Sequence, residues 1–111
     1  MNEKIIEGLR ILGRLACANG INIFQHTVNG RRLRKMEFTL LLFMLTQEVD
    51  REIDRRAIIS GIYSNPEKIK DKSIDPIISR LNSSLKDVKF DFLIKNDGNG
   101  WHPKGFYLAK I

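Results

Sequence analysis

The last third of the sequence limits the fold most strongly, because a helical pattern is followed directly by the pattern of a hairpin with a long turn. Ile74, Ile78, Leu81 and Leu85 recur at spacings i, i+4, i+7 and i+11, which places them on one face of a helix over about residues 73–86. Residues 88–94 alternate as a strand does, and residues 105–111 form a returning strand after a turn-rich stretch. The sequence therefore predicts an α+β domain that ends in a helix and a β-hairpin.

A second hairpin is expected near the start of this domain. Asn29-Gly30 is the strongest two-residue hairpin signal in a sequence. It predicts a first strand over residues 21–28, with His26 on its surface, and a return strand over residues 31–33.

Three core helices are predicted between the two hairpins. Residues 35–46 are apolar on nearly all sides, which is typical of a helix at the centre of a core. Asp54 is expected to cap the next helix, over about residues 55–63, by accepting from its free amides. Ser73 or Asp75 is expected to cap the last helix in the same way.

Residues 1–20 form a separate N-terminal segment. Apolar side chains recur at helical spacing over residues 3–17 and predict an amphipathic helix that ends at Asn19-Gly20. Its apolar face would pack either on the domain of residues 21–111 or on a second copy of the helix. The second alternative predicts a homodimer.

Length and charge define the class of partner. The 111 residues are enough for one core and too few for two. The 19 Lys and Arg residues outnumber the 13 Asp and Glu residues, and the net charge of +6 suits a polyanionic partner. A basic domain of this size is therefore a candidate for binding nucleic acid.

Other functional classes find little support. Cys17 is the single cysteine, so no intramolecular disulfide is expected, and His26 and His102 lie too far apart in the sequence for a zinc site. No Ser/His/Asp set, phosphate-binding glycine loop or carboxylate cluster indicates an enzyme. Charged residues interrupt the N-terminal apolar pattern, which argues against a signal peptide or a membrane span. We expect a cytoplasmic protein without catalytic residues, metal or cofactor.

The face of the 73–86 helix opposite its apolar stripe is small, polar and mildly basic, as suits a helix that enters a major groove. The residues expected at a DNA interface are Lys72, Ser73, Pro76, Ile77, Ser79, Arg80, Asn82 and Ser83 around the helix, and Lys95, His102 and Lys104 on the hairpin. Further phosphate contacts are expected among Arg31, Arg32, Arg34, Arg55 and Arg56.

Five motifs in order carry a resemblance to a known family. Glu37-Phe38-Thr39-Leu40-Leu41 is similar to a Glu-Phe-x-Leu-Leu signature, and Gly105-Phe106-Tyr107-Leu108 to a Gly-Tyr-x-Leu ending. The others are Val28-Asn29-Gly30 with Leu33, Ile53-Asp54-Arg55 with Ile58-Ile59, and Ser73-Ile74-Asp75 with Ile78-Ser79-Arg80-Leu81 and Leu85. Together they resemble the winged helix-turn-helix domain of the OmpR/PhoB class of transcriptional regulators, from about residue 24 to residue 111.

The resemblance implies a function and a placement on DNA. It implies a sequence-specific regulator of transcription whose recognition helix, residues 73–86, lies in the major groove of double-stranded DNA. The wing, residues 94–106, would contact the flanking backbone or minor groove. No receiver domain is expected, because the first aspartate, Asp50, already lies within the winged-helix region.

The chain also departs from the family pattern. Ile77 stands where a polar base-reading residue is usual, and Asn82 and Ser83 stand where further basic residues are common. The wing is also enlarged by residues 96–104. An apolar Ile77 on an exposed helix flank would favour an alternative function, in which Ile77 and the long wing bind a protein, such as one of the transcription machinery, and DNA binding is lost or weakened.

Overall fold

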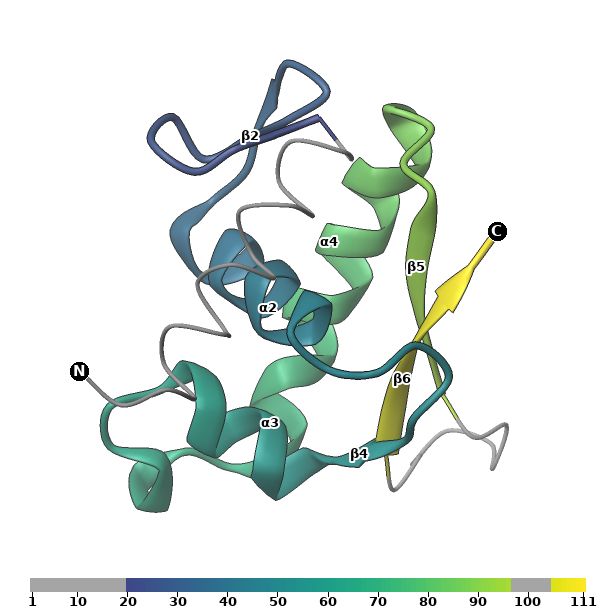
Figure 1. The fold of residues 1–111 in the computed structure, drawn as a ribbon. Coiled ribbons are helices and arrows are strands. Elements are labelled where there is room, and N and C mark those ends of the chain that lie inside the picture. The colour runs from purple at the N-terminus through teal and green to yellow at the C-terminus, as the bar shows by residue number, and fades with distance from the viewer. Residues whose placement is uncertain (1–19, 97–104) are drawn as a thin grey trace, which may run out of the picture.

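The computed structural model describes residues 20–96 and 105–111, which form an α+β fold (Figure 1). The expected helix over residues 3–17 and the hairpin residues His102 and Lys104 lie outside these ranges. The elements are β1 (Ile21–Asn22), β2 (Thr27–Val28), β3 (Arg31–Arg32), α2 (Lys35–Leu45), β4 (Ile53–Asp54), α3 (Arg55–Ile62), the 3-10 turns η1 (Pro66–Lys68) and η2 (Asp71–Ser73), α4 (Ile74–Asp87), β5 (Phe92–Asn96) and β6 (Gly105–Lys110).

The Asn29-Gly30 turn is confirmed. It joins β2 to β3 with Val28 opposite Arg31, and its two residues have φ angles of 48° and 86°. A turn with positive φ at both central residues matches the twist of an antiparallel pair, and Asn and Gly adopt that conformation at low cost.

The single strand expected over residues 21–28 is wrong, because a turn at residues 23–26 divides it into β1 and β2. The Asn22 side-chain oxygen accepts hydrogen bonds from the backbone amides of Phe24 and Gln25, at 3.0 and 3.1 Å. Such a local bond offers the backbone an alternative to the strand ladder. His26 therefore lies in a turn, with a φ of 55°, and its ring stacks on that of Phe38 at 4.8 Å.

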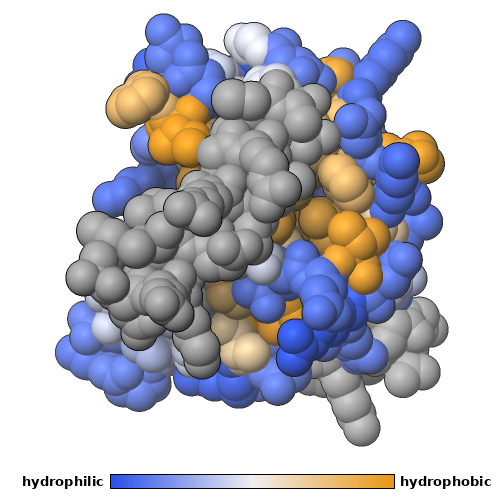
Figure 2. All heavy atoms as spheres, in the orientation of Figure 1, coloured by the Kyte–Doolittle hydropathy of each residue, from blue (hydrophilic) through white to orange (hydrophobic). Residues whose placement is uncertain are grey.

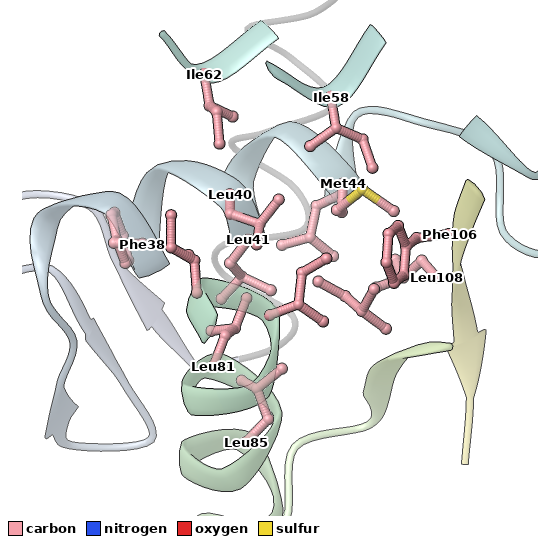
Figure 3. Packing of buried hydrophobic residues seen from close by; sticks show 14 of the residues in the cluster. Phe38, Leu40, Leu41, Met44, Ile58, Ile62, Leu81, Leu85, Phe106 and Leu108 are labelled. Atoms are coloured by element: carbon pink, nitrogen blue, oxygen red, sulfur yellow. The ribbon is translucent and has the colours of Figure 1, made fainter. Parts of the chain in front are cut away.

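Helix α2 lies at the centre of the core, as expected. Figure 3 shows Leu40, Leu41 and Met44 of α2 among side chains from the neighbouring elements. These neighbours include Ile58 and Ile62 of α3, Leu81 and Leu85 of α4, and Phe106 and Leu108 of β6. Because α2 packs against α3, α4 and β6, it fixes their relative positions.

The two expected helix caps have different outcomes. The cap of α3 is confirmed, since the backbone amide of Ala57 donates to the Asp54 carboxylate at 2.7 Å. The side-chain cap expected for α4 is wrong, because Ser73 makes no capping hydrogen bond and Asp75 already lies inside the helix. Ser73 already has helical dihedral angles, −63° and −24°, at the end of η2, whereas a capping side chain needs an extended backbone. Helix α4 therefore continues directly from a 3-10 turn.

The C-terminal hairpin begins later than the sequence suggests. Lys89 has a φ of 55°, and the amides of Lys89 and Phe90 donate to the carbonyls of Lys86 and Leu85, at 3.2 and 3.0 Å. This pattern is the Schellman closure of a helix, in which a buried apolar residue follows the left-handed one. Residues 88–91 are used for this closure, so β5 starts at Phe92 and not at Val88.

The second sheet has the order β4-β6-β5, with both pairs antiparallel. Ile94 of β5 faces Leu108 of β6, and Ile53 of β4 faces Phe106. All four side chains are buried, so the sheet closes one side of the core. Figure 1 shows β5 running beside α4, with β1–β3 near one end of that helix and α3 near the other.

On the face drawn in Figure 2, separate apolar patches lie among hydrophilic residues. The large apolar side chains that stand exposed in the described ranges are Ile23, Phe24, Val49 and Ile111. Phe24, at the β1–β2 turn, is 97% exposed. Within residues 20–96 and 105–111, no helix combines the length and apolarity needed to cross a bilayer.

Candidate functional site

Helix α4 has one buried and one exposed face. Its buried side chains are Ile74, Ile77, Ile78, Leu81, Ser84 and Leu85. Pro76, Ser79, Arg80 and Ser83 are exposed, and their spacing of i, i+3, i+4 and i+7 places them in one stripe along the helix. The stripe carries small side chains and one arginine, so another molecule can approach the helix backbone closely.

Ile77 does not belong to this stripe, and the expectation that it lies on an exposed flank is wrong. Its side chain is only 6% exposed and is part of the hydrophobic core. Ile74 lies one turn before it and Leu81 one turn after it, so Ile77 widens the buried stripe. A buried Ile77 can contact neither a base edge nor a protein partner.

Asn82 also has a different role from the one expected. Its amide nitrogen donates to the carbonyl of Ile94 at 2.8 Å, and its amide oxygen accepts from the Ile94 amide at 2.9 Å. These two bonds occupy both ends of the side-chain amide. Asn82 therefore holds β5 against α4 and is not free to bind a base.

The remaining expected residues flank the stripe. Lys72 and Ser73 are exposed in η2, immediately before α4, and Lys95 is exposed on β5. No described carboxylate forms an ion pair with Lys72 or Lys95. Both lysines therefore add positive charge around α4.

A cleft brings Arg80 and Ser83 together with the segment between β3 and α2. We call it the arginine cleft; its volume is about 270 Å³, and it is lined by Arg31, Arg32, Leu33, Arg34, Glu37, Arg80, Ser83 and Ser84. A second cleft of about 510 Å³ shares Arg32, Leu33 and Arg34 and adds His26 and Lys35. The basic surface of α4 therefore continues onto the β3–α2 segment.

Most of the arginines in the cleft form no ion pair with a described carboxylate. Arg31 forms an ion pair with Asp87 at 2.6 Å, in which both side chains are about half exposed. Arg32, Arg34 and Arg80 form no ion pair with any carboxylate in the described ranges. Three guanidinium groups are thus available to an anion.

Besides Arg31, two more of the five arginines considered as phosphate contacts are engaged within the fold. Arg55 is 4% exposed, which makes its expected phosphate contact wrong; it pairs with Asp75 at 2.7 Å and lies over the Phe106 ring at 5.2 Å. Arg56 is exposed, but it pairs with Asp71 at 3.0 Å and donates to the carbonyls of Ile69 and Pro66. The η1–η2 connection is fixed by these contacts.

Glu37 is the residue of the cleft that sequence reasoning missed. It is 5% exposed, and its Oε2 accepts no hydrogen bond. The available signal was a carboxylate in the first turn of a helix whose next residues are almost all apolar. Among the described residues, no group of three or more His, Cys, Asp or Glu side chains could hold a metal ion.

Comparisons with protein-family models, with curated proteins and with solved structures found no match for this chain. The OmpR/PhoB resemblance therefore rests on its motifs and stays a prediction.

Proposed function

We propose that this chain is a winged helix-turn-helix protein that binds double-stranded DNA sequence-specifically and regulates transcription. The exposed stripe of α4, continuous with the arginine cleft, is the observation that carries the proposal. Small side chains let a helix lie deep in a major groove, and clustered arginines neutralise the phosphates on either side.

The arrangement of elements supports a winged-helix reading. Helices α2, α3 and α4 precede a hairpin of β5 and β6, and β4 adds a third strand beside β6. In this reading α4 is the recognition helix and the β5–β6 hairpin is the wing. Asn82 couples the two, so that both meet the duplex in a fixed geometry.

Each exposed residue has a defined role in this proposal. Arg80 forks onto a guanine edge or a phosphate, and Pro76, Ser79 and Ser83 allow the approach. Arg32 and Arg34 bind the backbone beside α4. Lys72, Ser73 and Lys95 bind it at the other margins of the stripe, and His102 and Lys104 would extend the wing contacts.

The alternative function, protein binding through an exposed Ile77 and the long wing, loses the feature that favoured it because Ile77 is buried. We therefore retain DNA as the partner.

The Arg80→Ala variant tests the proposal. A preferred duplex is first selected from a random pool, and affinities are then measured by fluorescence anisotropy. Loss of Arg80 should cost about 1–3 kcal/mol on the preferred duplex if the side chain reads a base. If it contacts only phosphate, the loss should be smaller and equal on all duplexes.

Arg51→Ala is the matched control, because it removes the same charge from the exposed connection between α2 and β4. Both variants should unfold at the temperature of the wild type, since both side chains are exposed. Wild-type protein that binds no duplex at low salt, or an Arg80→Ala variant indistinguishable from Arg51→Ala, would contradict the proposal.

A further inference from the structure

We propose that the arginine cleft binds a phosphate monoester, and that Glu37 makes it selective for an oxyanion that carries a proton. This inference goes beyond DNA binding, because the phosphodiesters of a DNA backbone have no such proton. The ligand chemistry is that of a small phosphorylated molecule or of a terminal phosphate.

The positive side of the site comes from two segments that are distant in sequence. Arg32 and Arg34 belong to the β3–α2 segment and Arg80 to α4, and none of them is paired with a described carboxylate. Guanidinium groups present several N–H donors in a planar fork that matches phosphate oxygens. Ser83 adds a hydroxyl at the same wall.

Arg31 contributes less to this charge. Its Nη1 lies 2.6 Å from the Asp87 carboxylate, which neutralises it and fixes it at the edge of the cleft. An anion would therefore be held mainly by the three arginines without such a partner.

Glu37 gives the site its unusual feature. A carboxylate in the wall of a cation-rich cleft repels an anion unless that anion offers a hydrogen-bond donor. The carboxylate is itself nearly buried, with Oε2 accepting no hydrogen bond, and a buried acceptor without a donor is unfavourable. A ligand that donates a hydrogen bond to Glu37 removes this defect.

Protonated phosphate meets both requirements. A phosphate monoester has a second pKa of about 6, so near that pH many molecules carry one P–OH group beside charged oxygens. The P–OH group donates to Glu37, while the charged oxygens accept from the arginines. Sulfate and phosphodiesters carry no proton under these conditions and leave Glu37 as a repulsive charge.

The volume of the cleft agrees with a ligand of this size. At about 270 Å³ it lies slightly below the range of about 300–1,000 Å³ that is usual for drug-sized ligands. It suits a phosphate group with a small organic substituent.

Calorimetry on the full chain at pH 6 tests the selectivity with methyl phosphate, dimethyl phosphate and sulfate. We expect methyl phosphate to bind more tightly than the other two by about tenfold or more, since one hydrogen bond to a charged group has at least that effect. Equal affinity for sulfate and methyl phosphate, or no saturable binding of methyl phosphate at millimolar concentration, would overturn the proposal.

The Glu37→Gln variant assigns the selectivity to one side chain. The glutamine amide is close in size and can donate to an unprotonated oxygen, so the preference over sulfate should fall to about threefold or less. Glu48→Gln, the same change at an exposed position, should keep the wild-type preference. A Glu37→Gln variant that folds and discriminates like the wild type would contradict the role of Glu37. If the variant does not fold, the comparison of the three anions on the wild-type protein still tests the proposal.

A competition experiment identifies the source of the phosphate. Displacement of methyl phosphate by a short duplex with a 5′-phosphate, but not by the same duplex with a 5′-hydroxyl, would assign the site to DNA ends. Equal displacement by both duplexes would show that the diester backbone binds Arg32, Arg34 and Arg80 as the proposed function has it and that Glu37 does not exclude it, which would overturn the selectivity. Displacement by neither duplex supports a small phosphate monoester as the ligand and assigns these arginines to it in place of the DNA backbone.

Discussion

At the scale of single residues, Arg55 shows how one buried side chain positions the proposed recognition helix. Its Nη1 pairs with Asp75 of α4 at 2.7 Å and donates to the carbonyl of Asp71 at 2.9 Å. Its guanidinium also lies over the ring of Phe106 in β6. One residue at the start of α3 thus holds the start of α4 and a strand of the second sheet.

Arg55→Ala should lower the free energy of unfolding by about 2–3 kcal/mol, which chemical denaturation can measure. Breaking a fully buried pair typically costs about 3–5 kcal/mol, but the Asp75 side chain is 40% exposed and keeps part of its hydration.

Arg56→Ala is the control, because the neighbouring arginine forms an ion pair in which both side chains are about half exposed. Its loss should cost about 1 kcal/mol or less. Similar effects of the two substitutions would mean that burial of Arg55 adds nothing to stability.

At the scale of elements, Asn82 connects α4 to β5 and so determines where the proposed wing lies relative to the proposed recognition helix. Both bonds go to the backbone of Ile94, whose own side chain is buried. A side-chain amide that satisfies both polar groups of one strand residue acts like a short piece of neighbouring strand.

Asn82→Ala should lower the free energy of unfolding by about 1–3 kcal/mol, since it leaves the amide and carbonyl of Ile94 without protein partners. Asn82→Asp should cost at least as much, because a carboxylate cannot donate to the Ile94 carbonyl. Ser83→Ala, at the next and exposed position, should stay within about 0.5 kcal/mol of the wild type. Thermal and urea unfolding of the three variants provide the measurement. An Asn82→Ala variant as stable as Ser83→Ala would contradict this role.

The elements differ in how well the sequence predicts them. Helices α2, α3 and α4 were predicted because their apolar side chains recur along several turns, and the Asn29-Gly30 turn because those residues favour positive φ. The turn at residues 23–26 was missed because one Asn22 side chain overrides an alternating pattern. Strand β4 has only two residues, too few to show any period.

The candidate site was harder to predict for a related reason. Asn82 takes its role from a tertiary partner, and the arginine cleft joins residues 31–37 to residues 80–84. Helical periodicity shows on which side of its own helix a residue lies. It contains no information on which other element covers that side. The exposed positions of Arg80 and Ser83 were therefore predictable, and so was the burial of Ile77 between Ile74 and Leu81, while the place of Glu37 in a cleft with Arg80 was not.

At the scale of the whole molecule, the net charge of +6 should govern association with DNA. Affinity for a duplex should fall steeply between about 50 and 200 mM salt, with a logarithmic slope of about −0.9 per phosphate neutralised. Arg34→Ala should make that slope shallower by about 1 if Arg34 contacts the backbone. Anisotropy titrations at several salt concentrations provide the measurement, and an affinity that is independent of salt would exclude an electrostatic basis.

The assembly of the molecule is a second prediction at this scale. We expect a homodimer held by residues 3–17, whose apolar spacing the resemblance does not require. Light scattering should give a dimer for the full chain and a monomer for a chain that starts at Gly20. The same oligomeric state for both chains would show that residues 3–17 do not hold the dimer. Unfolding of the shorter chain would show instead that the segment packs on the core.

The contact between Asn82 and Ile94 also bears on how the protein behaves at high concentration. Among the described strands, β5 lies at the edge of its sheet and pairs with β6 alone. An edge strand with free polar groups can pair with another chain and start aggregation. Because Asn82 occupies the amide and carbonyl of Ile94, the middle of this edge is closed to an incoming strand. A side chain that holds β5 against α4 thus also protects the folded protein from edge-to-edge association.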